Sequence, residues 1–158
     1  MNNEPYLYFD EMAIHSFLYS RKAWSYMDEP VQCPVNSGTR LKVSVYGAIG
    51  NVQQLPFLDY YYKPTNGIDV LKFLQKLKQR MAKLTDKKVH IILDNHAAHR
   101  SNKHGTKPYF AENFITHFMP PSSPQINAIE HFWSPFKARF KKALLENPLD
   151  KIDQGKFE

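Results

Sequence analysis

The sequence contains a single cysteine, Cys33, in 158 residues. One thiol cannot form a disulfide within the chain, which excludes a disulfide-stabilised scaffold and predicts a reducing compartment. Long apolar runs are also missing, and the first residues show no signal-peptide pattern. We therefore expect a cytoplasmic protein that neither spans nor crosses a membrane.

Acidic residues are in the minority. The sequence contains 15 Asp and Glu and 21 Lys and Arg, which gives a formal net charge of +6, and 14% of the residues are aromatic. This combination favours a folded protein with a polyanionic partner such as DNA over a disordered basic tail; the alternative is an ordinary basic globular protein. The length fits one domain, which we place at residues 1–147, followed by a polar tail at residues 148–158.

A short apolar run at residues 89–93 ends in a carboxylate, Asp94. Such a run predicts a buried strand of a sheet that is covered on both faces. Ligands and metals collect at the C-terminal edge of strands in open α/β sheets, so Asp94 is a candidate site residue. The alternative is that Asp94 only caps the next turn.

Hydrophobic patterning predicts the other elements. Apolar or alternating runs predict strands at residues 6–11, 41–50, 52–62 and 114–118, with Pro56 interrupting the third. Apolar residues three and four apart predict helices at residues 66–84 and 127–144, with a short helix at residues 109–113. The proline-broken residues 24–39 predict a long loop.

Two of these elements carry further acids. The first strand ends in Asp10 and Glu11, which point to opposite faces, so only one of them can face a given site and the strand register decides which. Asn127 is placed to cap the final helix, with Glu130 at its third position. Glu130 is therefore either the capping-box partner of Asn127 or a site residue.

The order of the elements predicts an α/β ribonuclease H-like fold with a mixed five-stranded sheet flanked by helices. In that topology the first strand lies beside the fourth and parallel to it, which places Asp10 next to Asp94, while the final helix can bring Glu130 to the same point. Three converging carboxylates repel one another unless cations lie among them. Oxygen ligands with open positions favour Mg²⁺ or Mn²⁺, and a pair of such ions about 4 Å apart suits phosphodiester chemistry.

Two sequence blocks carry a resemblance to a known family. They are Leu93-Asp94-Asn95-x-x-x-His99 and Pro120-Pro121-x-Ser123-Pro124-x-x-Asn127-x-x-Glu130-x-x-Trp133-Ser134. Together they resemble the catalytic core of the mariner-related insertion-sequence transposases, which carry an Asp-Asp-Glu triad.

The resemblance implies a role for each matching residue. It makes Asp10, Asp94 and Glu130 the metal ligands, with Asn95, His99 and Asn127 as supporting residues. It also implies a DNA transposase, in which water cuts DNA at the end of the element and the freed 3′ hydroxyl attacks target DNA.

Histidines and basic residues complete the candidate site. The cluster of His96, His99 and His104 raises zinc as an alternative, but no thiolates or paired histidines on one helix face accompany it. The expected contacts to the DNA backbone are the exposed cations of the final helix and of the segment after Asp94: Arg100, Lys103, Lys107, Lys137, Arg139, Lys141 and Lys142. Such contacts are expected to be weak in sequence preference and sensitive to salt.

Two features depart from the family pattern. Pro135 falls inside the final helix, where it either kinks that helix or starts a new one capped by Ser134. Transposases of this family carry a helix-turn-helix region ahead of the catalytic domain, whereas the first predicted strand begins within ten residues of Met1. We expect that region to be missing or separately encoded, and a homodimer is a further expectation. The rival functions are a non-catalytic remnant that binds DNA or a full-length partner, and a nuclease that only hydrolyses.

Overall fold

The structure is a computed structural model that describes residues 4–15, 27, 42–52, 55–62, 66–121 and 123–146. Apart from residue 27, the predicted loop at residues 24–39 lies outside this part of the chain, as does the predicted tail at residues 148–158. Among the described residues, no helix has the length and hydrophobicity that a membrane span requires.

One mixed sheet of five strands, in the order β3-β2-β1-β4-β5, forms the centre of the molecule. The strands are β1 (Tyr6–His15), β2 (Lys42–Gly50), β3 (Phe57–Tyr61), β4 (His90–Leu93) and β5 (Ile115–Phe118). The first three strands form an antiparallel meander, whereas β4 runs parallel to β1, and β5 runs parallel to β4. The predicted sheet, with its first strand beside its fourth, is therefore confirmed.

Strand β1 is longer than the sequence pattern predicts. It continues four residues past the two acids, so Asp10 lies within the strand, where it pairs with Gly47 of β2. The extension follows from packing, because Met12 and Ile14 keep the alternation going and are both 3% exposed. The prediction that the strand ends at the acids is therefore wrong.

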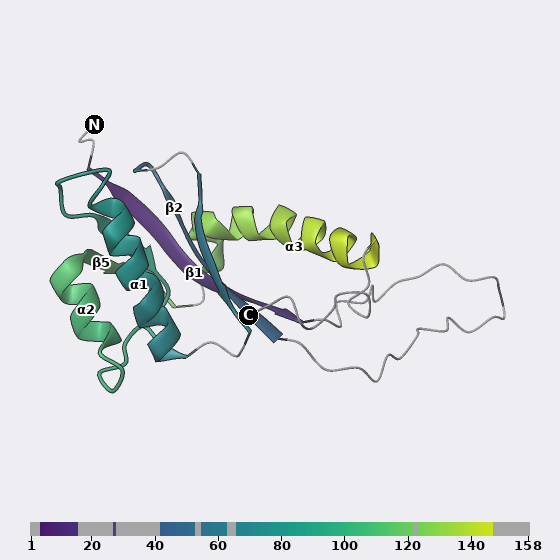
Figure 1. The fold of residues 1–158 in the computed structure, drawn as a ribbon, viewed down its shortest axis with the longest axis horizontal. Coiled ribbons are helices and arrows are strands. Elements are labelled where there is room, and N and C mark those ends of the chain that lie inside the picture. Colours follow the sequence, from purple (N-terminus) through teal and green to yellow (C-terminus); the bar gives the residue numbers. More distant parts are fainter. Residues whose placement is uncertain are drawn as a thin grey trace.

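Helices cover both faces of the sheet (Figure 1). They are α1 (Gly67–Met81), α2 (Thr106–Asn113) and α3 (Ala128–Glu146), and a 3₁₀ turn at Pro124–Ile126 precedes α3. Helices α1 and α2 pack on one face and α3 on the other, so the protein has three layers and two apolar cores.

The two cores follow from the alternation of side chains along β1. Leu7 and Phe9 belong to the core under α1 and α2, while Met12 and Ile14 belong to the core under α3. Trp133 of α3 is the largest side chain of the second core and is 1% exposed. Asp10 therefore faces α3 and Glu11 faces the opposite layer, as the alternation predicts.

Helix α1 begins where the sequence predicts but ends earlier. The side chain of Asn66 accepts hydrogen bonds from the backbone N–H groups of Ile68 and Asp69, which caps the first turn. The helix stops at Met81, and Leu84, which the predicted apolar stripe includes, is 48% exposed. The true buried stripe includes Val70 and Phe73, so the predicted helical face was rotated slightly from the real one.

Helix α3 runs through Pro135 without a break between its two ends. Of the two alternatives for Pro135, the new helix that starts at this residue is therefore not formed. Asn127 stands directly before the helix, but its side-chain oxygen has no hydrogen-bond partner among the described residues and the residue is 3% exposed. The expected side-chain cap is therefore absent among the described residues.

Candidate active site

Asp10 is a buried carboxylate at the interface between β1 and α3. It is 9% exposed, and its two oxygens accept different hydrogen bonds. Oδ1 accepts from the backbone N–H of Glu11 at 2.9 Å, and Oδ2 accepts from the indole Nε1 of Trp133 at 3.1 Å.

The electrostatic surroundings of Asp10 oppose its negative charge. Burial raises its pKa, the nearby charge of Glu11 raises it further, and the two hydrogen bonds only partly offset this, which leaves the pKa at about 7. The charge of Glu130 also raises this pKa, so the carboxylate on α3 acts electrostatically on the carboxylate on β1. A cation between them would remove the penalty.

Trp133 joins the helix that carries Glu130 to the strand that carries Asp10. It lies three residues after Glu130, which puts both side chains on one side of α3. The ring fits against Gly47, where an added Cβ would lie 2.5 Å from Cη2 of the indole. The sequence predicts Trp133 only as a core residue; its spacing from Glu130 is the signal that points to the site.

Asp94 follows β4 and is held by the loop that comes after it. Its Oδ1 accepts from the backbone N–H of His96 at 2.9 Å and lies 3.0 Å from Nδ1 of His99. The hydrogen bond with His99 is the main reason that the pKa of Asp94 is lowered, so this carboxyl is ionised at neutral pH. Asp94 thus caps the next turn, as the alternative interpretation holds, and one oxygen atom of its half-exposed carboxylate serves that purpose.

Glu11 reaches the same histidine from the layer opposite Asp10. Its Oε2 lies 2.8 Å from Nε2 of His99, and the two side chains are 8% and 0% exposed. Burial by itself lowers the pKa of His99, but the hydrogen bonds with Asp94 and Glu11 outweigh it and raise the pKa to about 10. His99 is therefore an imidazolium that donates to two carboxylates.

The three predicted ligands do not form a closed cluster. Within the described residues, the one group of three metal-ligating side chains whose atoms all lie within 4.8 Å of one another is Glu11, His96 and His99. The structure links Asp10 with α3, and it links Asp94 with His99. His104, the third histidine of the zinc alternative, packs instead against Gly67 at the start of α1.

Asn95 supports the loop after β4. Its side-chain nitrogen donates to the backbone oxygen of Met119 at 2.6 Å, and its side-chain oxygen accepts from Arg100. The guanidinium of Arg100 lies 4.5 Å from the centre of the Phe118 ring. These contacts tie the segment after Asp94 to the end of β5.

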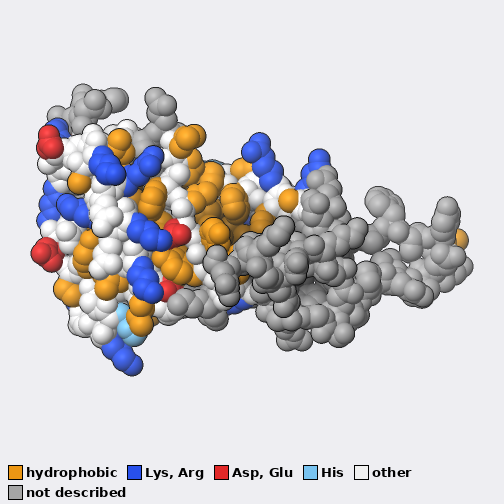
Figure 2. Space-filling view, in the orientation of Figure 1, with side chains coloured by type: hydrophobic (Ala, Val, Ile, Leu, Met, Phe, Trp, Pro, Cys, Tyr) orange, Lys and Arg blue, Asp and Glu red, His pale blue; other side chains and the backbone are white. Residues whose placement is uncertain are grey.

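The predicted DNA contacts lie on the surface. The cations that the structure describes there are all exposed: Arg100, Lys103, Lys107, Lys137, Arg139 and Lys142. The side chain of Lys141 is outside the described part of the chain. On the face drawn in Figure 2, blue Lys and Arg side chains outnumber red acidic ones, in line with the net charge of +6.

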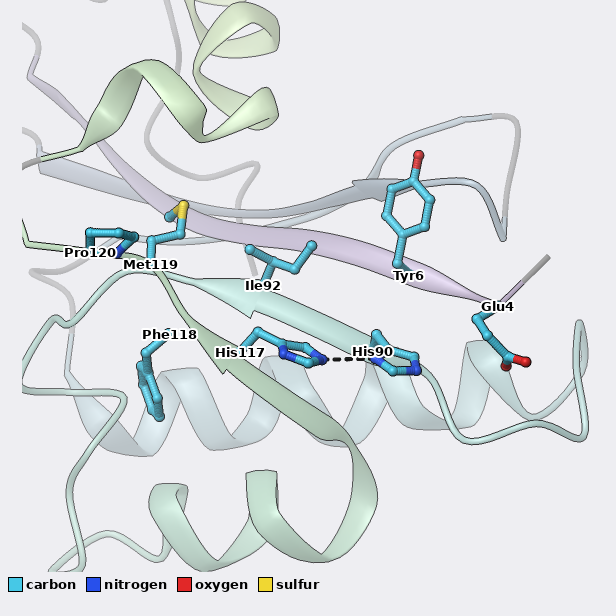
Figure 3. Close-up of a pocket in the computed structure, with 8 residues that line it drawn as sticks. All are labelled: Glu4, Tyr6, His90, Ile92, His117, Phe118, Met119 and Pro120. Atoms are coloured by element: carbon cyan, nitrogen blue, oxygen red, sulfur yellow. Dashed lines mark hydrogen bonds between the residues drawn. The ribbon is translucent and has the colours of Figure 1, made fainter. Parts of the chain in front are cut away.

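A separate hollow of about 550 Å³ lies along β4 and β5 (Figure 3). Nδ1 of His90 and Nε2 of His117 are 2.8 Å apart there, and the two rings stack at an angle of 10°. This pocket is not the carboxylate site, because none of the three predicted ligands lines it. Its lining consists of Glu4, Tyr6, His90, Ile92, His117, Phe118, Met119 and Pro120.

The sheet order and the helices on both faces define a ribonuclease H-like fold, with Asp10 within β1 and Asp94 directly after β4. The family model described as DDE superfamily endonuclease matches residues 5–150, and the chain belongs to this family. No match is found among curated protein sequences.

Solved structures share the fold at low sequence identity. A paired-end complex of Mos1 transposase with the left transposon end is 16% identical, with a TM-score of 0.58, over 90% of this chain and 47% of that one. A Mos1 mariner paired-end complex with Mn is 15% identical, with a TM-score of 0.53, over 90% of this chain and 47% of that one. An intasome of simian T-cell lymphotropic virus is 14% identical, with a TM-score of 0.55, over 92% of this chain and 42% of that one.

The chain spans less than half the length of these proteins. The family match and the shared fold confirm the predicted resemblance to the Asp-Asp-Glu catalytic domain of mariner-related transposases.

Proposed function

We propose that this chain is the catalytic domain of a DNA transposase, with Asp10, Asp94 and Glu130 as its metal-binding carboxylates. It cleaves DNA at the ends of an element and joins the freed 3′ hydroxyl to target DNA. Family membership supports the class of chemistry. The roles of the individual residues rest on the geometry of the site.

The observation that carries the proposal is the placement of Asp10. A carboxyl that is 9% exposed, with two further carboxylates raising its pKa, is costly to ionise in the metal-free protein. Strongly shifted groups of this kind gather at functional sites. Glu130 and Asp94 supply further hard oxygen ligands, which suit Mg²⁺ or Mn²⁺.

When bound, the divalent ions would stabilise the charge that develops on the phosphodiester oxygens. The residues of the chain hold and orient the groups around them. Trp133 holds one oxygen atom of Asp10, Oδ2, relative to α3, and Asp94 is already ionised at neutral pH. Glu130 is half-buried on the first turn of α3.

Exposed cations on two segments would bind the DNA backbone. Lys137, Arg139 and Lys142 lie on α3, beyond Glu130, and Arg100, Lys103 and Lys107 lie between Asp94 and the first turn of α2. Both groups of cations therefore follow a candidate ligand along the chain. Phosphate contacts of this kind position DNA without reading its sequence.

Specific recognition of the element's ends belongs, in this proposal, to a helix-turn-helix region outside the described residues. Assembly of two catalytic domains as a homodimer on paired ends completes the proposal. Light scattering with and without DNA measures that assembly.

Metal binding is the direct test. Titration calorimetry with Mn²⁺ compares the wild-type chain with Asp10→Ala, Asp94→Ala and Glu130→Ala, and with Glu112→Ala, an exposed acid of α2, as the matched control. We expect the first three variants to lose binding and the control to keep it. Absence of binding to the folded wild-type chain would contradict the proposal and favour a non-catalytic remnant.

Strand joining separates a transposase from a nuclease that only hydrolyses. A pre-cleaved duplex with a free 3′ hydroxyl is supplied with Mn²⁺ and a target duplex. Joined products, lost with Asp94→Asn, are the expected result. Cleavage without any joined product would leave hydrolysis as the sole activity.

A further inference from the structure

His99 bonds to one carboxylate through each ring nitrogen. Nδ1 lies 3.0 Å from Oδ1 of Asp94, and Nε2 lies 2.8 Å from Oε2 of Glu11. Nδ1 also lies 3.3 Å from the backbone oxygen of Asp94. The histidine therefore connects strand β1 to the carboxylate that follows β4.

The ring of His99 has no freedom to turn away from these partners. It is fully buried, with the ring of Phe9 at 5.2 Å and the ring of Phe110 at 6.2 Å between centroids. Asp94, by contrast, is half exposed. A buried imidazole thus holds, together with the backbone N–H of His96, one oxygen of a carboxylate that is otherwise open to solvent.

The carboxylate of Glu11 is buried, where a negative charge is energetically unfavourable. Its side chain is 8% exposed, and its Oε1 is buried without a hydrogen-bond partner among the described residues. A buried charge of this kind needs a close partner of opposite charge or a strong donor, and His99 supplies it. Since Glu11 faces away from Asp10, the bond to His99 gives this acid a role of its own.

We propose that Glu11 and His99 are positioning residues, which orient the carboxylate of Asp94 for metal binding through a relay of hydrogen bonds. This inference rests on the proposed function of Asp94 as a ligand. Oδ1 of Asp94 is occupied by His99 and by the backbone N–H of His96, so Oδ2 is the oxygen presented to a cation. Carboxylate ligands are commonly held by outer partners in this way, and loss of such a partner weakens metal affinity.

The compact group of Glu11, His96 and His99 is not itself the metal site in this inference. Both nitrogens of His99 are engaged by oxygen atoms, so neither has a lone pair directed at a cation. His96 is exposed and forms the rim of the group.

Amide variants of His99 separate orientation of Asp94 from packing. The side-chain nitrogen of Asn occupies the position of Nδ1, and that of Gln occupies the position of Nε2. His99→Asn keeps a donor toward Asp94, whereas His99→Gln keeps a donor toward Glu11. Titration calorimetry measures the Mn²⁺ affinity of both variants and of Glu11→Ala and Glu11→Gln. The controls are His96→Asn and Glu112→Gln. Near-ultraviolet circular dichroism checks the fold of each variant.

We expect His99→Gln to weaken Mn²⁺ binding about 10- to 100-fold, and His99→Asn to lose clearly less. Glu11→Ala should lose more than Glu11→Gln, which still offers an oxygen to Nε2. The two controls should bind as the wild type does.

Different outcomes overturn different claims. The positioning role is overturned if the two His99 variants lose Mn²⁺ affinity equally. It is also overturned if neither variant loses affinity while Asp94→Asn abolishes binding. Both outcomes leave the proposed function intact. A loss in His96→Asn as large as that in His99→Gln shows that the group binds the ion directly and also overturns the positioning role. A wild-type chain that binds no Mn²⁺ overturns the proposed function, and this inference falls with it.

Discussion

The indole of Trp133 donates a hydrogen bond to the carboxylate of Asp10, at 3.1 Å, across the interface between α3 and β1. The contact joins residues 123 positions apart in the sequence. It turns a core side chain into a fixed donor at the candidate metal site, and the first prediction follows from it.

Trp133→Phe removes this donor and keeps an aromatic ring. Because the hydrogen bond lowers the pKa of Asp10, its loss should raise that pKa above its present value of about 7. Carboxyl carbon chemical shifts followed against pH measure the change. Trp133→Ala, which also removes the buried ring, should cost about 3 to 5 kcal/mol of unfolding free energy. An unaltered Asp10 titration in the folded Phe variant would contradict the contact.

Gly47→Ala should destabilise the protein by about 1 to 3 kcal/mol, since the new methyl group would lie 2.5 Å from Cη2 and 2.8 Å from Cζ2 of Trp133. Urea unfolding measures the loss. The double variant Gly47→Ala with Trp133→Phe should recover part of it, because the smaller ring makes room. Strictly additive losses would show that the two residues do not meet.

Asp94→Asn should abolish Mn²⁺-dependent cleavage of DNA and leave the fold intact. The amide still reaches the loop after β4 but carries no charge for a cation. Cleavage of a labelled duplex is the measurement, and circular dichroism checks the fold. A variant that still cuts would remove Asp94 from the set of ligands.

The stability of the metal-free protein should fall as pH rises from about 7 toward 10. His99 binds its proton more tightly when folded, with a pKa of about 10 against 6.5 for a free imidazole, so its contribution is full below 6.5 and is lost as pH rises through 10. The slope should approach about 1 kcal/mol per pH unit. Asp10 gives a slope of the same sign, because its pKa is raised to about 7 in the folded protein. Its contribution to stability is lost as pH rises through that value, below most of the range in which His99 titrates.

Chelated samples of wild type, His99→Asn and exposed His96→Asn, unfolded in urea at each pH, separate the two histidines. The slope should disappear in the His99 variant and persist in the His96 variant. A slope shared by all three proteins would assign it to other groups.

DNA binding should weaken steeply as salt rises from about 50 to 200 mM, because each phosphate contact releases condensed counterions. Fluorescence anisotropy of a labelled duplex measures it. Replacing Lys137, Arg139 and Lys142 by Gln should reduce both the affinity and the dependence on salt. Lys83→Gln, at an exposed position just after α1, is the matched control. A response that is flat with salt would exclude the basic surface as the binding site.

Local patterns were enough to predict most of the fold. The run before Asp94 and the apolar spacing of α3 are features of neighbouring residues, and each marks an element that the structure contains. The length of β1 was missed because two consecutive acids interrupt its apolar pattern. The strand continues past these acids because it pairs with β2 and packs against α3, and such long-range contacts are not visible in the local sequence pattern.

The sequence names the residues of the candidate site, whose roles stay predictions, but it does not reveal the contacts between them. The carboxylates could be named from the ends of two predicted strands and from one conspicuous block. The bond between Glu11 and His99 spans 88 positions and depends on the register of a parallel strand pair. Asn127 shows the opposite error, since its place before a helix predicts a side-chain cap, whereas its side-chain oxygen has no hydrogen-bond partner among the described residues.

The position of α3 at the end of the described chain has a consequence for synthesis. Chains fold from the N-terminus as they leave the ribosome. Until residues 128–146 emerge, Met12, Ile14 and Val45 lack the cover that α3 provides, and Asp10 lacks both the indole and the neighbouring acid of that helix. Until α3 has been made, the growing polypeptide therefore lacks both the indole donor to Asp10 and one of the three proposed carboxylate ligands.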